Sequence, residues 1–253
     1  MRFCSIGSGS RGNGTLIQHG KTCILVDTGF TLKDVEFRLA QKGLTPLNLS
    51  AILITHEHSD HIKGVGPLAR KYRIPVYCSH GTSLYDGLGK IPSLVVFDSH
   101  ASFEIGELSI TPVVVPHDAR EPTQFVIEDP ERKKLGILTD LGSLTPHILD
   151  VYDGCHGLML ETNHDVQMLR MGPYPPKLKV RVEGSLGHLN NQQAMHFLNN
   201  VNCENLKFLV ATHISEKNNN TAVAIDAISN GFPWEKDFVI MATQENGFPW
   251  CEL

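Results

Sequence analysis

Short apolar segments separated by glycine-containing turns dominate the first third of the chain. Residues 15–19 and 22–27 are rich in β-branched side chains and flank a Gly20-Lys21 turn, which predicts a β-hairpin. Residues 51–55 (AILIT) form a continuous apolar run that is typical of a strand buried on both faces. Between these strands, residues 31–43 carry apolar side chains at mostly helical spacing and end in a glycine, which predicts a helix.

The rest of the chain also alternates between strand-like and helix-like patterns. Four apolar runs, LVVF, LSITPVVV, TQFVIE and LGIL, are separated by polar turns in its middle part. Further on, residues 158–161 and 208–212 predict strands, whereas residues 190–201 and 221–230 predict helices. No low-complexity linker interrupts this pattern, so we expect one α/β domain over residues 1–253, with two sheets covered by helices.

The pentapeptide NGFPW occurs twice, at residues 230–234 and 246–250. Two copies are too few to build a solenoid, because each repeat of a solenoid must bury its apolar face against its neighbours. Both copies are therefore interpreted as turns.

Composition and charge narrow the class of protein. The 253 residues, 41% of them hydrophobic, are enough to bury a large core. No apolar run reaches the ~20 residues that span a membrane, and the first residues lack the apolar region of a secretory signal. The six cysteines include no C-x-x-C pair, so buried thiols in a reducing cytoplasm are expected. A net charge of −5 disfavours a generally basic surface but allows a local basic patch.

The strongest signal for chemistry is a group of four possible metal ligands within six residues, in a chain that holds 13 histidines. The segment HEHSDH follows the AILIT strand directly. His56 and His58 are two residues apart and point to the same side of an extended chain. Asp60 and His61 come where the chain is expected to turn into a helix, so the four side chains could serve two neighbouring metal ions. The alternative is an exposed polar turn, but the buried strand before the motif favours a metal site.

This H-x-H-x-D-H pattern resembles the signature of the metallo-β-lactamase-fold hydrolases. The resemblance implies a four-layer αββα sandwich, of α/β (α+β) class, with the metal site at one edge of the two sheets. It also implies three further ligands, each at the end of a later strand. These are His117 in VVVPHDA, Asp140 in GILTDLG and His213 in FLVATHIS. Each of the three follows an apolar run that reads as a strand on its periodicity alone.

The same resemblance implies that the ligands divide between two divalent metal ions. The implied sets are His56, His58 and His117 for one ion and Asp60, His61 and His213 for the other. Asp140 and a hydroxide would bridge the two ions, and Asp27 in ILVDTG would orient the site without binding metal. The mixed nitrogen and oxygen ligands suit zinc and also accept manganese or iron.

From the residues alone, other roles stay open for the three later ligands. His117 could lie in a surface turn, and Asp140 could cap a helix that begins near Leu144. His213 could be a hydrogen-bonded histidine at the end of a strand.

A second set of segments resembles one branch of this superfamily, the YycJ/WalJ proteins. The segments are ETNHD (161–165), GPYPPKLKVR (172–181), GHLNN (187–191), SGSRGN near the start, and HIS with NNN within 213–220. The resemblance covers nearly the whole chain. It implies a cytoplasmic bacterial exonuclease that acts on the 5′ ends of DNA.

Several side chains of this second set could handle a substrate. His164 and His188 lie in turns rich in asparagine or glycine, and either could contact a phosphate or protonate a leaving oxygen. With Asp60, they are the predicted catalytic residues. A carboxylate such as Glu161 beside either ring would raise the pKa of that histidine. Alternatively, His164 or Asp165 caps a helix over residues 166–170.

The densest basic stretch comprises Lys177, Lys179 and Arg181, preceded by Arg170. At strand spacing, the first three would fall on one face. Such a face is by default a solvated charged surface, and the sharper alternative is a surface that binds the phosphates of a substrate.

Residues 7–12 match G-x-G-x-x-G, yet the segment that follows, TLIQHG, is β-like rather than helical. A dinucleotide site requires a helix there, so this interpretation is disfavoured. A loop whose backbone amides support the edge of the metal site or a phosphate fits better.

These observations predict hydrolysis of DNA or another phosphodiester by a metal-activated hydroxide. One alternative is a hydrolase of thioesters, lactams or lactones on the same metal site. Another is a structural or regulatory metal protein, which is disfavoured because the ligand set leaves a position open for water. No membrane partner is expected, and the oligomeric state cannot be read from the sequence.

Overall fold

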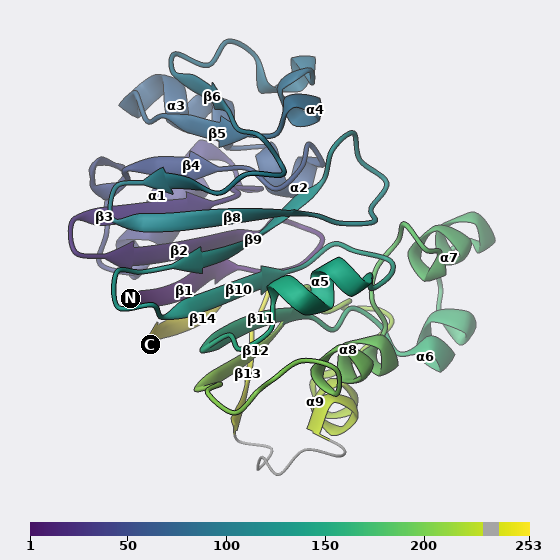
Figure 1. Ribbon diagram of the computed structural model, residues 1–253. Coiled ribbons are helices and arrows are strands. Elements are labelled where there is room, and N and C mark those ends of the chain that lie inside the picture. The colour runs from purple at the N-terminus through teal and green to yellow at the C-terminus, as the bar shows by residue number, and fades with distance from the viewer. Residues whose placement is uncertain (230–237) are drawn as a thin grey trace.

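The computed structural model describes residues 1–229 and 238–253, and these contain two sheets (Figure 1). The strands of the first sheet are β1 (Arg2–Gly7), β2 (Gly14–His19), β3 (Thr22–Val26), β4 (Ala51–Leu53), β5 (Val76–Cys78), β6 (Leu94–Val96) and β14 (Phe248–Glu252). The strands of the second are β7 (Phe103–Ile105), β8 (Leu108–Val114), β9 (Thr123–Glu128), β10 (Lys134–Leu138), β11 (Gly157–Glu161), β12 (Phe208–Thr212) and β13 (Val239–Met241).

The order of the strands is β14-β1-β2-β3-β4-β5-β6 in one sheet and β13-β12-β11-β10-β9-β8-β7 in the other. The predicted hairpin is β2–β3, paired in antiparallel register from Thr15↔Val26 to His19↔Thr22. β3, β4 and β5 are parallel, as are β10, β11, β12 and β13. The strands predicted from apolar runs are therefore confirmed, whereas β7, β13 and β14 were not expected.

Strand periodicity builds two separate cores. In β9, Phe125 and Ile127 point into the large core between the sheets, where they join Phe3 of β1. Val126, between them in sequence, points the other way into a second core with Phe197. Because successive side chains of a strand face opposite sides, β9 serves both cores.

Helices cover the outer faces, as the αββα arrangement requires (Figure 1). On the first sheet these are α1 (Leu32–Gln41), α2 (Ser59–Ile62), α3 (Val65–Tyr72) and α4 (His80–Ser83), with the 3₁₀ turns η1 (Pro46–Asn48) and η2 (Asp86–Leu88). On the second they are α5 (Pro146–Val151), α8 (Asn191–Leu198) and α9 (Thr221–Ser229). α6 (Val166–Met171) and α7 (Pro176–Glu183) project from one end of the molecule (Figure 1). None of the described helices is long and apolar enough to cross a membrane.

The basic stretch forms helix α7, so the prediction that Lys177, Lys179 and Arg181 share the face of a strand is wrong. The helix begins at Pro176, a residue whose fixed φ and missing N–H suit the first helical position. Val182 is 8% exposed and Val180 is 73% exposed, although both would lie on one face of a strand. The helical period decides which apolar side chain is buried here.

Two smaller expectations have clear outcomes. Five of the six cysteines are buried free thiols and Cys203 is half-buried, as expected for a chain without disulfides. The second NGFPW copy turns at Asn246 and Gly247, whose φ is +59°, and then enters β14. The first copy, residues 230–234, lies outside the described residues.

Candidate metal centre

The predicted ligands gather at one edge of the two sheets, because each follows the carboxyl end of a strand. His56 and His58 follow β4, Asp60 and His61 lie on α2, His117 follows β8, Asp140 follows β10, and His213 follows β12. β8 runs in the same direction as β10, since both are antiparallel to β9. The strand ends of the second sheet therefore deliver their ligands to the same place.

Three histidines form the first group of ligand atoms. Nε2 of His56 lies 3.0 Å from Nδ1 of His58, and Nε2 of His117 lies 3.3 Å from the same atom. Burial lowers the pKa of His56 and of His117, and the neighbouring histidine rings lower it further. Both rings therefore stay neutral near neutral pH and offer lone pairs, which is the state that binds a metal ion.

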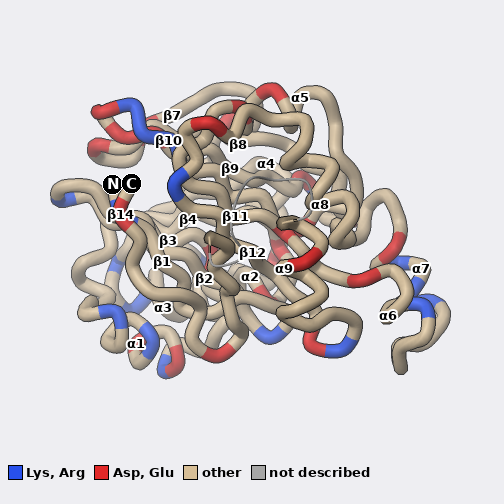
Figure 2. Tube along the Cα trace, turned by 90° about the horizontal axis from the view of Figure 1, so that it is seen from below, with Lys and Arg blue, Asp and Glu red and all other residues tan. Residues whose placement is uncertain are grey.

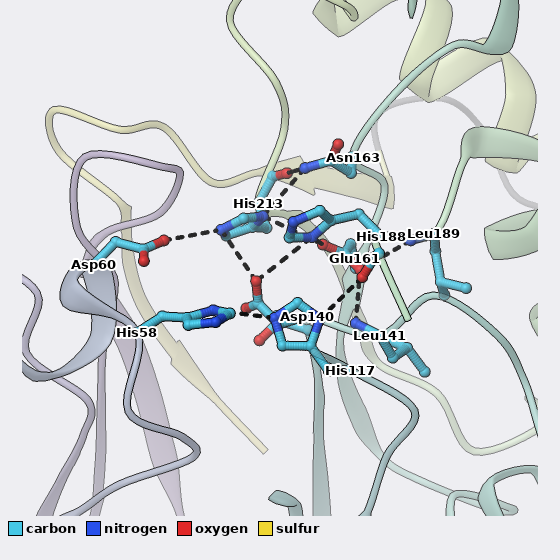
Figure 3. Close-up of polar contacts among 12 residues, drawn as sticks. His58, Asp60, His117, Asp140, Leu141, Glu161, Asn163, His188, Leu189 and His213 are labelled. Carbon is cyan, nitrogen blue, oxygen red and sulfur yellow. Dashed lines mark hydrogen bonds and ion pairs between the residues drawn. The ribbon is translucent and has the colours of Figure 1, made fainter. Parts of the chain in front are cut away.

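Asp60, His61 and His213 form the second group, of which Figure 3 labels Asp60 and His213. Oδ2 of Asp60 lies 3.6 Å from Nε2 of both His61 and His213. Burial lowers the pKa of His61, but the carboxylates of Asp140, Asp27 and Asp60 outweigh burial and raise it to about 9. These carboxylates thus concentrate negative charge where a cation would sit.

Asp140 connects the two groups. Its Oδ2 lies 3.3 Å from Nε2 of His61, and its Oδ1 lies 3.4 Å from Nε2 of His213. Ligand atoms of His56, His61 and Asp140 all lie within 4.8 Å of one another, so this carboxylate adjoins both groups. Its position agrees with the bridging place that the family resemblance implies.

Two unsatisfied atoms show that these residues fit a divalent cation. Asp140 is 2% exposed and His213 is 3% exposed. Even so, Oδ2 of Asp140 and Nε2 of His213 form no hydrogen bond with a described residue, and their polar neighbours are the ion-pair contacts given above. A buried polar atom without a partner is costly, and carboxylate oxygens and imidazole nitrogens are ordinary ligands of zinc, manganese and iron.

Asp27 supports the site but belongs to neither group of candidate ligand atoms. Its Oδ2 lies 2.8 Å from Nδ1 of His61, which leaves Nε2 of that ring for the second group. Thr55 fixes the carboxylate with two bonds, from its backbone N–H at 2.9 Å and from its hydroxyl at 2.7 Å. Asp27 also adopts a φ of +59°, a strained conformation that this network holds in place.

Glu161 is a buried carboxylate that organises the other side of the site (Figure 3). Its Oε1 lies 2.8 Å from Nδ1 of His188 and 3.2 Å from Nδ1 of His213. Its Oε2 accepts from the backbone N–H groups of Leu141 and Leu189. Burial acts to raise the pKa of Glu161, but the charges and hydrogen bonds of the two histidines hold it below its ordinary value. One carboxylate therefore fixes the orientation of two rings.

The structure separates the two histidines that were predicted to handle substrate. His188 stacks on His213 with ring centroids 5.1 Å apart, and its Nδ1 lies 3.5 Å from Oδ1 of Asp140. His164, in contrast, is fully buried beneath the site, and burial lowers its pKa to about 4. It does not line the cleft, so a catalytic or substrate-binding role for His164 does not fit its position. The alternative that Asp165 caps a helix is confirmed, because its side chain accepts from the N–H of Met168 at the start of α6.

The glycine loop before β2 braces the ligands, as expected, and β2 rather than a helix follows it. The N–H of Asn13 donates to the backbone oxygen of Asp60 at 2.8 Å, and its side-chain Nδ2 lies 3.1 Å from Nε2 of His61. The hydroxyl of Ser8 accepts from the N–H of His213. Gly29 packs so closely on the backbone of Asp60 that a Cβ there would collide with it.

An open cleft of about 360 Å³ lies over these residues. We call residues 166–183, which comprise α6, α7 and the loop between them, the α6–α7 arm. The residues that line the cleft are Ser10, His58, Ser59, Asp60, Asp118, Asp140, Asn163, Tyr174, Leu178, Arg181, Val182, Gly187, His188, His213 and Ser215. Four of them, Tyr174, Leu178, Arg181 and Val182, belong to the arm.

Basic residues occur on this arm as they do around α1 (Figure 2), and only Arg181 among the described Lys and Arg residues lines the cleft. Its guanidinium forms two hydrogen bonds with the carboxylate of Asp118, which follows the ligand His117. Lys179 donates to the backbone oxygen of Arg170, and Lys177 does not line the cleft. The basic stretch therefore contributes one side chain to the cleft.

Sequence reasoning missed several residues of the site. Thr55 lies 3.0 Å from Nδ1 of His56 and also fixes Asp27, yet it was read only as part of a strand. Asn163 donates to the backbone oxygen of His213, and Ser215 lines the cleft two residues after that ligand. Their signal was adjacency to a ligand or to a strand end, a position that many uninvolved residues share.

Comparisons with known proteins agree with this geometry. A family model described as the Beta-lactamase superfamily domain matches residues 22–214. The chain is 35% identical over 233 residues to exodeoxyribonuclease YycJ of Bacillus anthracis, a match that covers 90% of this chain and 88% of that protein. The chain belongs to the β-lactamase superfamily.

Within this superfamily, the chain is also 36% identical over 227 residues to exodeoxyribonuclease WalJ of Streptococcus pneumoniae, which covers 87% of this chain and 83% of that protein. Among solved structures, the metallo-β-lactamase fold protein YhfI of Bacillus subtilis superimposes with a TM-score of 0.72 at 19% identity, covering 99% of each chain. The predicted superfamily, its YycJ/WalJ branch and the fold are confirmed. The same relatives support a metal-dependent hydrolase.

Proposed function

We propose that this member of the β-lactamase superfamily is a dinuclear metal-dependent phosphodiesterase that removes nucleotides from the 5′ ends of DNA. Two relatives that match most of the chain are named exodeoxyribonucleases. The observation that carries the proposal is the pair formed by His188 and Glu161, which places a histidine in the cleft beside the candidate bridging residue Asp140.

The two groups of ligand atoms would each hold one divalent ion. His56, His58 and His117 would hold the first, Asp60, His61 and His213 would hold the second, and Asp140 would contact both. When bound, two such ions supply a hydroxide nucleophile at neutral pH and neutralise charge on the phosphate oxygens.

His188 is suited to protonate the oxygen that leaves the phosphorus. Glu161 engages Nδ1 of the ring and fixes its orientation, so Nε2 is left for the substrate. The ring lines the cleft and is partly exposed, so it can reach the leaving group and regain a proton from solvent. Hydrolysis of an activated carbonyl substrate would depend on such an acid far less.

Arg181 is the candidate for binding a phosphate of the substrate. Its planar guanidinium matches two phosphate oxygens as well as it matches the carboxylate of Asp118. A phosphodiester that enters the cleft would compete with Asp118 for this side chain. The exposed Lys177 and the half-buried Lys179 could contact phosphates only farther along a longer strand.

The proposal is tested by elemental analysis of the purified protein, followed by assays in zinc, manganese and iron(II). The substrates are 5′-phosphorylated DNA, labelled at either end, and thioester and lactone compounds. Release of 5′-terminal nucleotides is expected, with two bound ions per chain. Hydrolysis of the esters without hydrolysis of DNA would replace the proposal with the carbonyl hydrolase alternative. Cytoplasmic location remains a separate prediction that a localisation measurement can address.

A further inference from the structure

The α6–α7 arm gives the cleft a partly apolar wall that metal chemistry does not require. Leu178, Arg181 and Val182 of α7 lie three and four residues apart, so they share the face of the helix that lines the cleft. Tyr174, in the loop before α7, lines the same space. An aromatic ring, an aliphatic side chain and a guanidinium therefore adjoin the candidate ligands.

Tyr174 is held in a rigid loop. Pro173 precedes it, and Pro175 and Pro176 follow it, so three of the four residues at positions 173–176 have a fixed φ. Gly172, at the start of the loop, packs so closely on the side chain of Asn218 that a Cβ would collide with it. Asn218 belongs to the loop that follows the ligand His213. The tyrosine is thus positioned relative to the metal centre before any ligand binds, which lowers the entropy cost of stacking on it.

The chemistry of this wall matches a nucleotide. A nucleotide joins a flat apolar base to an anionic phosphate, and the wall offers an aromatic ring beside a guanidinium. A simple thioester or lactone has no flat aromatic group for such a ring to stack on.

We propose that Tyr174, in the same cleft wall as Leu178, is a stacking site for the nucleobase of the nucleotide being cleaved, with Arg181 on its phosphate. This inference rests on the proposed phosphodiesterase function and deepens it. Every base has a flat face, so stacking holds any terminal nucleotide and makes digestion independent of sequence. Tyr174 is then a binding residue that acts on KM more than on kcat.

The test compares two single-stranded 5′-phosphorylated oligonucleotides that differ only in the first two nucleotides, which carry bases in one and are abasic in the other. Tyr174→Ala should raise KM for the DNA with bases about tenfold and change kcat little. Tyr174→Phe should behave like the wild type, since it keeps the ring. Phe37→Ala is the matched control, because Phe37 is an exposed aromatic residue on α1 outside the cleft. The abasic DNA should raise the KM of the wild type by a similar factor, and the two losses should not add.

A binding measurement separates this inference from the proposed function. Calorimetry of the zinc-loaded protein should show tighter binding of thymidine 5′-monophosphate than of 2-deoxyribose 5-phosphate, and Tyr174→Ala should remove the difference. If the wild type cleaves DNA but Tyr174→Ala leaves KM unchanged, or raises KM equally for both DNAs, the stacking site is wrong and the proposed phosphodiesterase function stands. If no DNA is cleaved but the difference in binding is present and depends on Tyr174, the nucleobase site stands and the proposed function is wrong. Absence of both cleavage and preferential binding overturns both.

Discussion

Oε1 of Glu161 lies within hydrogen-bond distance of two rings at once, 2.8 Å from Nδ1 of His188 and 3.2 Å from Nδ1 of His213. One of these rings is a candidate metal ligand and the other is the candidate acid. A single buried carboxylate at the end of β11 therefore links the metal centre to proton transfer. Hydrogen-bonding partners of this kind typically fix the tautomer and the direction of a metal-binding imidazole.

The first prediction concerns this link. Glu161→Gln keeps the shape of the side chain and one acceptor oxygen but removes the charge, so we expect kcat/KM on DNA to fall about 10–100-fold. Glu183→Gln, at an exposed glutamate that pairs with Arg170, is the control and should retain activity. The measurements are steady-state kinetics and the metal content of each variant. Full activity together with full metal content in Glu161→Gln would show that the carboxylate does not organise the site.

His188→Ala should separate substrates by their leaving groups. On DNA, whose leaving oxygen must be protonated, we expect a loss of about 10²–10⁴-fold in kcat. On the p-nitrophenyl ester of thymidine 5′-monophosphate the loss should be below about tenfold, because nitrophenolate departs without a proton. His196→Ala, on an exposed face of α8, serves as the control. An equal loss on both substrates would rule out the role of His188 as an acid.

Replacement of Asp140 should remove hydrolysis and leave the fold intact. Asp140→Ala deletes the carboxylate that adjoins both groups of ligands, and we expect a rate loss of at least ~10²-fold and fewer bound ions per chain. Circular dichroism should be unchanged, since the apolar cores do not include this residue. Asp150→Ala, at an exposed aspartate of α5, is the control. Turnover like that of the wild type in metal-replete Asp140→Ala would refute the two-metal proposal.

The burial of His164 predicts how the free energy of unfolding depends on pH. Burial lowers its pKa in the folded protein from an ordinary 6.5 to about 4, although Glu161 opposes the shift. The unfolded chain therefore binds a proton more readily, so this contribution to stability is complete above about pH 6.5 and is lost as the pH falls toward 4. The loss between pH 7 and pH 5 should be about 2 kcal/mol.

The measurement is the free energy of unfolding in denaturant at these two pH values. His164→Gln should lose less stability than the wild type on acidification, whereas His80→Gln, an exposed position on α4, should match the wild type. Identical pH dependence in His164→Gln and the wild type would mean that His164 is not held neutral by burial.

The candidate metal ligands predicted from the sequence lie together in the structure because their signals are local. Each ligand directly follows an apolar run, and the carboxyl ends of parallel strands meet at one edge. His117, Asp140 and His213 could therefore be placed together from their strands, although the motif that names them as ligands came from the family resemblance. Asp27 was likewise assigned from the family resemblance, and in the structure it follows β3, the strand beside β4.

The substrate side was harder to predict because it depends on burial and on tertiary contacts. His164 and His188 occupy similar polar turns in sequence, yet one is covered by the fold and the other lines the cleft. In α7, alternating basic and apolar residues imitate a strand, and the prolines at positions 175 and 176 were a helix-start signal that was not used. The arm lies near the candidate ligands only through tertiary structure, so nothing in the sequence marked Tyr174 as a cleft residue.

The positions of the candidate ligands along the chain also set the order in which the ribosome synthesises them. His56, His58 and His117 leave the ribosome well before β12 is made, and they form one complete group of ligand atoms by themselves. The other group needs His213, which reaches its place only after β12 has paired with β11. If two ions bind as proposed, a nascent chain would be able to hold one ion at the histidine group before the second position is complete. Metal loading would then be stepwise, with the histidine group first.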